Sequence, residues 1–431
     1  MFDALSIRSP KRASGAPSGW GGFFPYYAGF PEIFARVLLQ SAKLSTDAIV
    51  LDPWNGSGTT TYTASLLGLT SQGFDLNPVM IIVARARLLP PSEADSIEPL
   101  AREIVRFSQL DRESLDNREP LSLWFSNETA ALLRGIERGI RRRLVGGMTI
   151  TPEGIKLDRL SGLAATFYVA LFTVCRELAA PFLSSNPTWL RRPKHHEPKI
   201  DIPRQVVESK LILNLCNMAL ALANRRHLLM TEQGVSEVSL TDTTATVLPE
   251  DSVDVILTSP PYCTRIDYTA ATRVELAVLA PLGQTTPEDL SRQMLGSTRV
   301  PTHAIEICPM WGQRCHDFLD ALRKHPSKAS SGYYYKTHLD YFDKMARSLG
   351  NLTRGLKPDG AAVLVVQDSF YKEIHNDLPS IVTEMAEAYG LRKRRREDFR
   401  MSRSMSGINP YTRVYKRLPG SVEAVLCFSK H

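Results

Sequence analysis

The sequence predicts an α/β fold in which a largely parallel sheet is interrupted by a helical insert. Two short apolar runs, residues 48–51 and 253–257, have the length and composition of buried strands. Between them, residues 90–235 carry apolar residues at helical spacing. We therefore expect one sheet built from both ends of the chain, with a helical segment inserted between them.

The first strand opens a strand–helix–strand unit. Residues 52–60 follow it directly and read Asp-Pro-Trp-Asn-Gly-Ser-Gly-Thr-Thr, and a helix is expected over 59–67, ended by Gly68. Gly56 and Gly58 allow the backbone to turn tightly and to approach a ligand closely. The loop lacks the lysine of a phosphate-binding P-loop, and its Gly-x-Gly is shorter than the dinucleotide fingerprint. These features indicate a unit that binds a nucleoside.

An acidic residue ends the second strand of this unit. Residues 71–74 form an expected strand that ends on Asp75, about 20 residues beyond the glycines, where an acid suits a pair of ribose hydroxyls. A helix is expected to begin at Asn77-Pro78. The alternative role for Asp75, an N-cap of that helix, stays open.

The strand at 253–257 stops at Ser259-Pro260-Pro261-Tyr262. Proline cannot donate to a sheet ladder, so the strand ends there, while both proline carbonyls remain acceptors. The Ser259 hydroxyl and the Pro260 carbonyl then form a rigid row of acceptors beside the ring of Tyr262. This arrangement suits a primary amino group on a flat base. The alternative is a plain turn that terminates the strand.

Together these segments resemble the S-adenosylmethionine-dependent DNA amino-methyltransferases. Ser-Pro-Pro-Tyr resembles motif IV of that family, residues 52–60 resemble motif I, and residues 73–78 resemble motif II. Residues 22–31, with Phe24 and Tyr26, resemble motif X, and residues 238–242 resemble motif III. The resemblance covers about residues 1–89 and 236–431.

The resemblance implies a Rossmann-like, seven-stranded methyltransferase sheet with an inserted helical domain, and S-adenosylmethionine as cofactor. Gly56 and Gly58 would pass under its methionine part, Asp75 would take its ribose, and Asp52 would lie near its amino-acid end. Asp242 would accept from its adenine amino group. The implied cofactor-binding residues are Phe24, Tyr26, Asp52, Pro53, Gly56, Ser57, Gly58, Thr59, Asp75 and Asp242.

The implied catalytic residues are Ser259, Pro260, Pro261 and Tyr262. A base flipped out of the DNA stack would place its exocyclic amine against Ser259 and the Pro260 carbonyl, with Tyr262 stacked on the ring. In this family, serine before the two prolines favours the 4-amino group of cytosine. The alternatives are the 6-amino group of adenine, an RNA amino-methyltransferase, and a catalytically silent DNA-recognition subunit that still binds the cofactor.

Four segments are expected along the chain. Residues 1–20 form a flexible tail, 21–89 the first part of the methyltransferase core, 90–235 a helical insert, and 236–431 the second part of the core. Helices are expected over 160–178, 211–229 and 341–352, whereas 281–331 reads as irregular. The insert is a candidate for target recognition or, alternatively, a scaffold or dimerisation element.

Composition adds expectations about partners and location. The net charge of +7 and the pI of about 9.0 favour a polyanionic partner, here double-stranded DNA. The candidate DNA-binding residues, Arg394, Arg395, Arg396, Arg403 and Arg413, flank a loop at 401–419, although such a run can also be a solvated face. Six scattered cysteines suit reduced thiols in a cytoplasmic protein, and no membrane span is expected.

Two further expectations concern metals and assembly. The spacing of His303, Cys308, Cys315 and His316 matches no common zinc finger, so no metal is expected. Family habit adds a cognate restriction endonuclease or other defence-system subunits as candidate partners.

Overall fold

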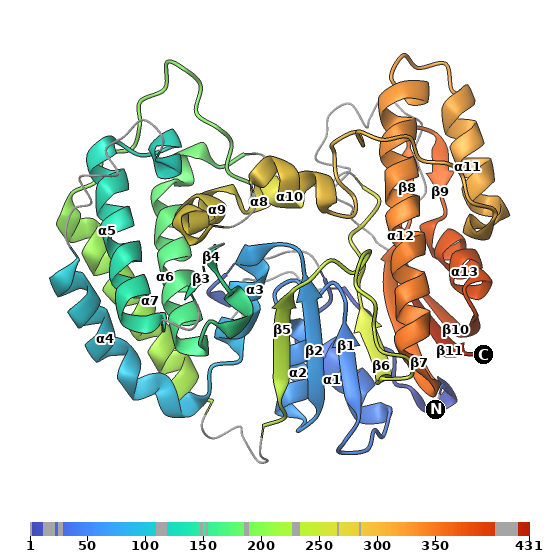
Figure 1. Ribbon diagram of the computed structural model, residues 1–431, viewed down its shortest axis with the longest axis horizontal. Helices are drawn as coiled ribbons and strands as arrows, with labels where there is room; N and C mark the ends of the chain where they lie inside the picture. The colour runs from blue at the N-terminus through green and yellow to red at the C-terminus, as the bar shows by residue number, and fades with distance from the viewer. Residues whose placement is uncertain are drawn as a thin grey trace.

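A seven-stranded sheet forms the centre of the computed structural model, with strand order β10-β11-β7-β6-β1-β2-β5 (Figure 1). The structure describes residues 2–11, 22–24, 29–108, 119–146, 150–151, 154–184, 189–225, 233–264, 267–283, 286–400 and 421–431. The strands are β1 (Ile49–Asp52), β2 (Thr70–Asp75), β5 (Ser236–Leu240), β6 (Val253–Thr258), β7 (Leu356–Gln367), β10 (Leu391–Arg400) and β11 (Val422–Lys430). The prediction of a Rossmann-like methyltransferase sheet is confirmed.

Five strands of this sheet are parallel, and β11 runs against both of its neighbours. β1 pairs in parallel with β2 on one side and with β6 on the other. β2 in turn pairs in parallel with β5, and β6 pairs in parallel with β7. β11 lies antiparallel between β7 and β10. Its interior residues are all buried rather than alternately buried and exposed, because the sheet is covered on both faces here.

The Lys-Pro-Asp-Gly sequence at 357–360, which is typical of a turn ahead of a strand, lies inside β7. β7 begins at Leu356, which pairs with Val253, and the ladder resumes only at Ala361, which pairs with Val255. The residues between them bulge out of the ladder, and Lys357 Nζ bonds both carboxylate oxygens of Asp254 at 2.8 and 2.9 Å. The Pro-Asp-Gly sequence therefore marks a bulge within the strand rather than its start.

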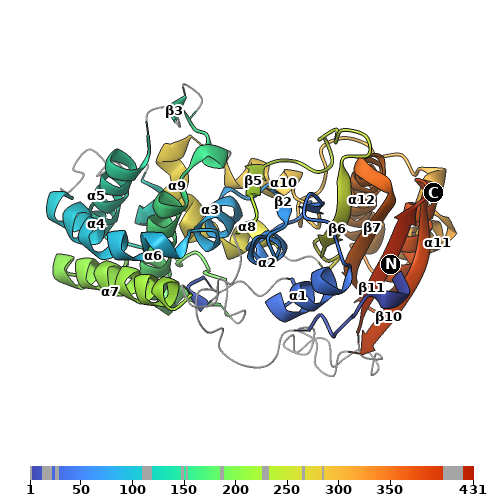
Figure 2. The ribbon, with the colours of Figure 1, turned by 90° about the horizontal axis from the view of Figure 1, so that it is seen from below.

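Side chains that alternate along the strands separate two cores. Val363 and Val365 face one layer, which holds α1 (Glu32–Ser41) and residues of α2 (Thr59–Leu66). Leu364 and Val366 face the other layer. That layer holds α11 (Gln313–Lys324), α12 (Tyr335–Gly355) and α13 (Leu378–Ala388). In Figure 2 the α1 and α12 layers lie on opposite sides of the sheet.

The middle of the chain is helical, as its periodicity predicts. Its long helices are α4 (Ala94–Phe107), α5 (Asn127–Leu144), α6 (Gly162–Leu178) and α7 (Arg204–Ala223). They lie beyond β5, at the end of the sheet opposite β10 and β11 (Figures 1 and 2). Their core is continuous with α3 (Pro78–Arg87) and α9 (Arg273–Leu279), so the inserted helices pack directly on elements of the sheet half.

The segment at 281–331 is less irregular than predicted. It contains α10 (Pro287–Gln293), capped by Thr286 with proline at its first position, and α11. The buried residues of α11 are Cys315, Phe318, Leu319 and Leu322, which have the spacing of one helical face. Cys315 occupies a position on this face where an aliphatic residue is usual, so the apolar face of α11 is easily missed in the sequence.

One helix of the described chain, α7, passes a length-and-composition test for a membrane span. Core helices of other proteins pass the same test. Here Val207, Leu211, Leu215, Met218 and Leu222 are buried on one side of α7, which packs against α4 and α6. That packing accounts for the buried apolar side of this helix.

A buried arginine joins the inserted helices to α9. Arg134 of α5 bonds both oxygens of Glu119, at 2.8 and 3.0 Å, and donates to the carbonyls of Ala277 and Val278 at 2.8 and 2.7 Å. Its side chain is only 3% exposed, so the charge depends on these partners. The contact links the insert to the helix that follows the Ser-Pro-Pro-Tyr turn.

Removing the carboxylate should therefore destabilise the fold. Glu119→Ala leaves Arg134 buried with only the more distant carboxylate of Glu137, at 3.6 Å, and we expect the unfolding free energy to fall by ~3 kcal/mol because two charge-assisted hydrogen bonds are lost. Glu98→Ala, which breaks the exposed pair with Arg102, should stay near wild type. Urea denaturation of the three proteins measures the difference, and equal midpoints for all three would contradict this assignment.

Candidate functional site

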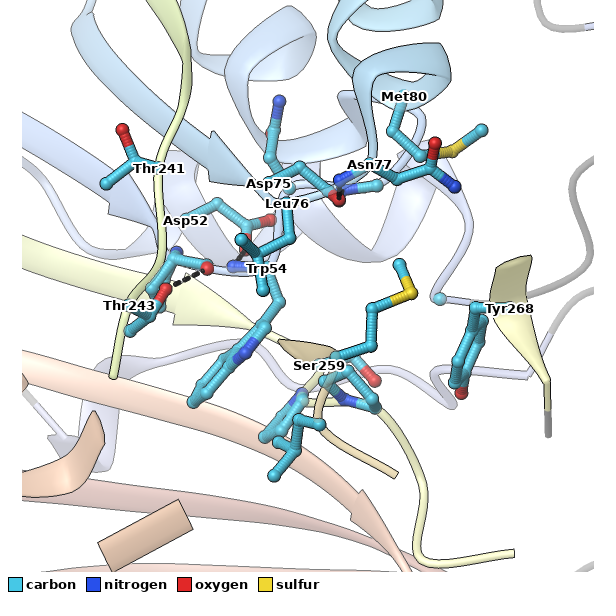
Figure 3. Close-up of a pocket in the computed structure, with 18 of the residues that line it drawn as sticks. Asp52, Trp54, Asp75, Leu76, Asn77, Met80, Thr241, Thr243, Ser259 and Tyr268 are labelled. Carbon is cyan, nitrogen blue, oxygen red and sulfur yellow. Dashed lines mark hydrogen bonds between the residues drawn. The ribbon is translucent and has the colours of Figure 1, made fainter. Parts of the chain in front are cut away.

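A pocket lies at the carboxyl ends of β1, β2 and β6, where the strand-end loops meet (Figure 3). It is lined by Gly29, Phe30, Asp52, Pro53, Trp54, Asn55, Gly56, Ser57, Thr59, Asp75, Leu76, Asn77, Met80, Thr241, Asp242, Thr243, Thr244, Ser259, Pro260, Pro261, Tyr262, Tyr268, Gln293, Met294 and Leu295. The Gly-Ser-Gly loop and the Ser-Pro-Pro-Tyr turn, about 200 residues apart in sequence, thus share one cavity.

The Gly-Ser-Gly loop depends on glycine for both its conformation and its packing. Gly56 and Gly58 have φ angles of 49° and 79°, in the left-handed region. A Cβ atom on Gly58 would lie 2.8 Å from the Cβ of Ala84 in α3. The loop therefore packs closely on α3 and presents its backbone to the pocket.

Asp75 holds this loop at the end of β2. Its Oδ2 accepts from Gly56 N at 2.9 Å, and its Oδ1 accepts from Asn77 N at 2.8 Å. The N-cap of α3 is Asn77, whose side chain accepts from Val79 N. Asp75 therefore does not cap the helix, and it faces the pocket beside Leu76 and Asn77 (Figure 3).

Asp52 joins the ends of β1 and β6. Its Oδ1 accepts from Thr258 Oγ1 at 2.6 Å, and its Oδ2 accepts from Thr60 Oγ1 at 2.6 Å. Burial is the main cause that raises the pKa of this carboxyl from 3.8 to about 6, against the opposing effect of these hydrogen bonds. Burial likewise raises the pKa of Asp75 to about 6, and the nearby charge of Asp52 adds to the effect.

The polar groups of the Ser-Pro-Pro-Tyr turn are nearly all bound within the protein. Ser259 Oγ donates to the Val365 carbonyl at 3.1 Å, and Tyr341 donates to the Pro261 carbonyl at 2.9 Å. Tyr262 N donates to the Tyr268 hydroxyl at 3.2 Å. The Tyr262 hydroxyl donates to Glu423 Oε1 at 2.6 Å.

Only acceptors of this turn then remain for a ligand. The proton of the Ser259 hydroxyl is used by Val365, so its lone pairs are what it can offer. In the described part of the chain, no group donates to the Pro260 carbonyl. A ligand that binds here must therefore bring donors, as a primary amine does.

Most of the predicted site residues come together, but two described members of the cofactor set, Gly58 and Phe24, do not line the pocket. The pocket brings together all four residues of the turn with Asp52, Pro53, Gly56, Ser57, Thr59, Asp75 and Asp242. Gly58 supports the loop from behind rather than lining the pocket. Phe24 is buried against Phe172 and Arg176 of α6, and it is not a lining residue. Tyr26 lies outside the described residues.

Several lining residues were not expected. Trp54, Leu76 and Asn77 adjoin predicted positions, so sequence proximity to the motifs could have found them. Tyr268 and Gln293–Leu295 belong to the segments after the turn, for which the sequence carries no motif. Tyr268 is held at the turn by its bond from Tyr262 N, whereas α12 anchors Gln293–Leu295: Lys344 Nζ donates to the Arg292 carbonyl at 2.6 Å.

The arginines predicted to bind DNA have protein partners. Arg394 Nε donates to Ser429 Oγ, Arg395 bonds the carbonyls of Phe2 and Leu5 and the carboxylate of Glu397, and Arg396 bonds Asp398 and Ser380. Each guanidinium has five N–H donors, so these bonds leave donors on Arg394 and Arg396 for a further partner. Arg403 and Arg413 lie outside the described residues.

The cysteine and histidine set has ordinary packing roles. Among the described residues, no group of three or more His, Cys, Asp or Glu side chains is placed to hold a metal ion. Cys315 is buried in the α11 core, and His316 Nε2 lies 3.0 Å from the Cys308 carbonyl oxygen.

Known proteins similar to this chain are methyltransferases. No protein-family model matches. The chain is 26% identical over 268 residues to the Type II methyltransferase M.BsoBI of Geobacillus stearothermophilus, which is 59% of this chain and 51% of that protein. It is 26% identical over 291 residues to the Type II methyltransferase M.AvaI of Nostoc sp. and of Anabaena variabilis, 64% of this chain and 57% of each relative. The chain spans little more than half the length of these relatives.

These names agree with the resemblance that the motifs carry. They do not distinguish the 4-amino group of cytosine from the 6-amino group of adenine as the acceptor of the methyl group.

The raised pKa of Asp52 predicts a pH-dependent loss of stability. Below about pH 4 this carboxyl is protonated in both states; between about pH 4 and 6 it ionises only in the unfolded chain, so the unfolding free energy falls as pH rises. Asp52→Asn removes this effect, so the stability of the variant relative to wild type should improve by up to ~3 kcal/mol across that window. Urea denaturation at pH 4, 5 and 6 measures this difference, and a constant difference would contradict it.

Proposed function

We propose that this chain is a site-specific DNA methyltransferase that methylates the exocyclic 4-amino group of cytosine and uses S-adenosylmethionine as methyl donor. One observation carries the proposal: a pocket suited to a nucleoside and an acceptor-only catalytic turn share a single cavity. The similarity to two Type II methyltransferases supports it. A restriction–modification or related defence system is the proposed setting, with a cognate endonuclease as partner.

The residues present fit the cofactor. Gly58 leaves no room for a Cβ, so the loop backbone can pass close to a ligand, and Asp75 turns a buried carboxylate toward the place of a ribose. Asp242, Thr243 and Trp54 line the part of the pocket where an adenine would lie. When bound, S-adenosylmethionine supplies a methyl group on a positively charged sulfur. The proposed cofactor-binding set is Asp52, Pro53, Gly56, Ser57, Gly58, Thr59, Asp75 and Asp242, with Tyr26 as a further proposed member; Phe24 is left out because it is buried against α6.

The catalytic turn would act by orientation. Two N–H donors of the target amine would bind Ser259 Oγ and the Pro260 carbonyl, which draws the nitrogen toward tetrahedral geometry and directs its lone pair at the methyl group. Because the Ser259 hydroxyl donates its proton to the Val365 carbonyl, its oxygen is available to accept a hydrogen bond from the amine. Pro261 fixes the turn, and Tyr262 would stack on the flipped base. Holding the reacting atoms in line supplies much of the rate enhancement in such a reaction.

A basic rim beside the pocket adds to the proposed DNA contacts. Arg273 of α9 lies near Arg192 and Arg299: burial lowers its pKa first, and the charges of these two arginines lower it further. Arg192 is 62% exposed and comes from the loop after residue 190, and Arg299 follows α10. Three separate segments thus bring three arginines together, with the carboxylates of Asp267 and Glu288 as opposing charges near them, and their net positive charge suits a polyanion. Phosphate contacts by Arg394, Arg395, Arg396, Arg403 and Arg413 remain part of the proposal.

Two substitutions should separate binding from chemistry. Ser259→Ala should lower turnover at least tenfold while leaving cofactor affinity nearly intact, because Ser259 would touch only the base. Asp75→Ala should instead lower the affinity for the cofactor, roughly tenfold or more, because its charge-assisted hydrogen bonds to the ribose are lost. Calorimetric titration of S-adenosylmethionine and single-turnover kinetics measure both effects. Unchanged affinity in Asp75→Ala would remove Asp75 from the site.

The product identifies the target base. DNA from a methylation-free host that expresses this chain should contain 4-methylcytosine by nucleoside mass spectrometry. Serine is a poor base, and the amine of cytosine would be activated mainly by geometry, with proton loss after methyl transfer. A 6-methyladenine peak alone would show that adenine is the target base, with the same mechanism of methyl transfer. Neither peak, with cofactor binding intact, would favour an RNA substrate or a silent recognition subunit.

Salt dependence tests the DNA contacts. Each lost phosphate contact reduces the slope of log affinity against log salt by ~0.9, so Arg192→Gln with Arg299→Gln should reduce it by ~1.8. Neutralising Arg394, Arg395 and Arg396 together should reduce it as well. Arg102→Gln with Arg347→Gln, both on exposed helix faces, serves as the charge-matched control. If a variant has the same slope as wild type, the arginines replaced in it make no phosphate contact.

A further inference from the structure

A buried carboxylate holds the aromatic residue of the catalytic turn. Glu423 lies near the start of β11, opposite Gln367 of β7 and Phe399 of β10. Its Oε1 accepts the hydrogen bond from the Tyr262 hydroxyl at 2.6 Å, across 161 residues of sequence. The residue is 6% exposed, and its Oε2 has no hydrogen-bond partner in the described part of the chain.

Packing alone does not explain an acid at this position. Burying a carboxylate costs free energy unless charged or polar partners compensate it. Glu423 has one such bond, to a neutral hydroxyl, and its pKa is raised chiefly by burial, with Lys11 as an opposing charge. Its neighbours Ala424 and Val425 show that an apolar side chain suits this strand. The tyrosine contact is therefore the specific interaction that the acid provides.

The contact completes the restraint of Tyr262. At one end, its backbone N–H donates to the Tyr268 hydroxyl at 3.2 Å. At the other end, its phenolic hydroxyl is tied to Glu423. The backbone bond holds the main chain of Tyr262, and the hydroxyl bond fixes the direction of its side chain, which χ1 sets. Because a phenolic hydrogen prefers to lie in the plane of its ring, the bond to Glu423 also favours one ring plane. The half-buried ring is thus fixed along the wall of the pocket that also holds Ser259 and Pro260.

We propose that Glu423 is a positioning residue that holds the Tyr262 ring in the orientation needed to stack on the flipped target base. The inference rests on the proposed function and extends it to a strand that carries none of the catalytic motifs. Glu423 acts through Tyr262 and does not itself touch the base. Holding the ring in advance reduces the entropy that base capture would otherwise cost.

Three variants test this role. Glu423→Ala removes the acceptor, and Glu423→Gln keeps an amide oxygen that can still accept from Tyr262. Glu208→Ala is the matched control, because it removes a partly buried carboxylate on α7 that pairs with Arg204 and does not contact the turn. The substrate is an oligonucleotide with the target site found by modification-sensitive sequencing. A second oligonucleotide carries 2-aminopurine next to the target cytosine, and its fluorescence rises when the target base leaves the stack.

Glu423→Ala should lower kcat/KM for DNA about tenfold and reduce the 2-aminopurine signal, because a hydrogen bond to a charged group is lost. Its affinity for S-adenosylmethionine should equal that of wild type. Glu423→Gln should recover most of both losses, and Glu208→Ala should behave as wild type.

The outcomes separate this inference from the proposed function. A wild-type chain that methylates no DNA would overturn both. An active wild type with an equally active Glu423→Ala would overturn the positioning role alone. Equal losses in the alanine and glutamine variants, or a parallel loss of cofactor affinity, would show that Glu423 acts on the fold instead.

Discussion

The hydrogen bond between Asp52 and Thr258 connects the two halves of the candidate site. It joins the ends of β1 and β6, which are 206 residues apart in sequence, at a distance of 2.6 Å. Because the two strands are parallel, their following loops emerge at the same edge of the sheet. The Gly-Ser-Gly loop and the Ser-Pro-Pro-Tyr turn are therefore placed side by side by one buried contact. The cost of burying this carboxylate is reflected in its raised pKa.

The rest of the molecule restrains the Ser-Pro-Pro-Tyr turn from several directions. Tyr341 of α12 binds the Pro261 carbonyl, Tyr268 binds Tyr262 N, and Ser369 donates to the Cys263 carbonyl at 3.0 Å. Each bond uses a polar group that could otherwise pair with a ligand or with water. The Ser259 hydroxyl oxygen and the Pro260 carbonyl remain as acceptors, so the turn favours a ligand that brings hydrogen-bond donors. The hydrogen bonds that hold the turn in place therefore also decide which of its groups a ligand can use.

The inserted helices are coupled to this turn through α9. Arg134 reaches from α5 to the carbonyls at the end of α9, and Arg176 of α6 pairs with buried Glu275 of α9 at 2.6 Å. Any rearrangement of the insert would disturb these buried charges, so the insert and the second half of the core behave as one packed unit. This physical link suits a role for the insert in presenting DNA to the pocket, and it equally serves a scaffold.

Short-range patterns determined a large part of this protein. Glycines in the left-handed region fixed the loop at Gly56 and Gly58, prolines ended β6, and apolar runs marked the strands, because these effects depend only on neighbouring residues. Tertiary structure alone decided that Phe24 packs against α6, that Arg395 binds the N-terminal segment, and that Glu423 meets Tyr262. These contacts join distant segments, and no local periodicity records which distant partner a buried polar side chain will find.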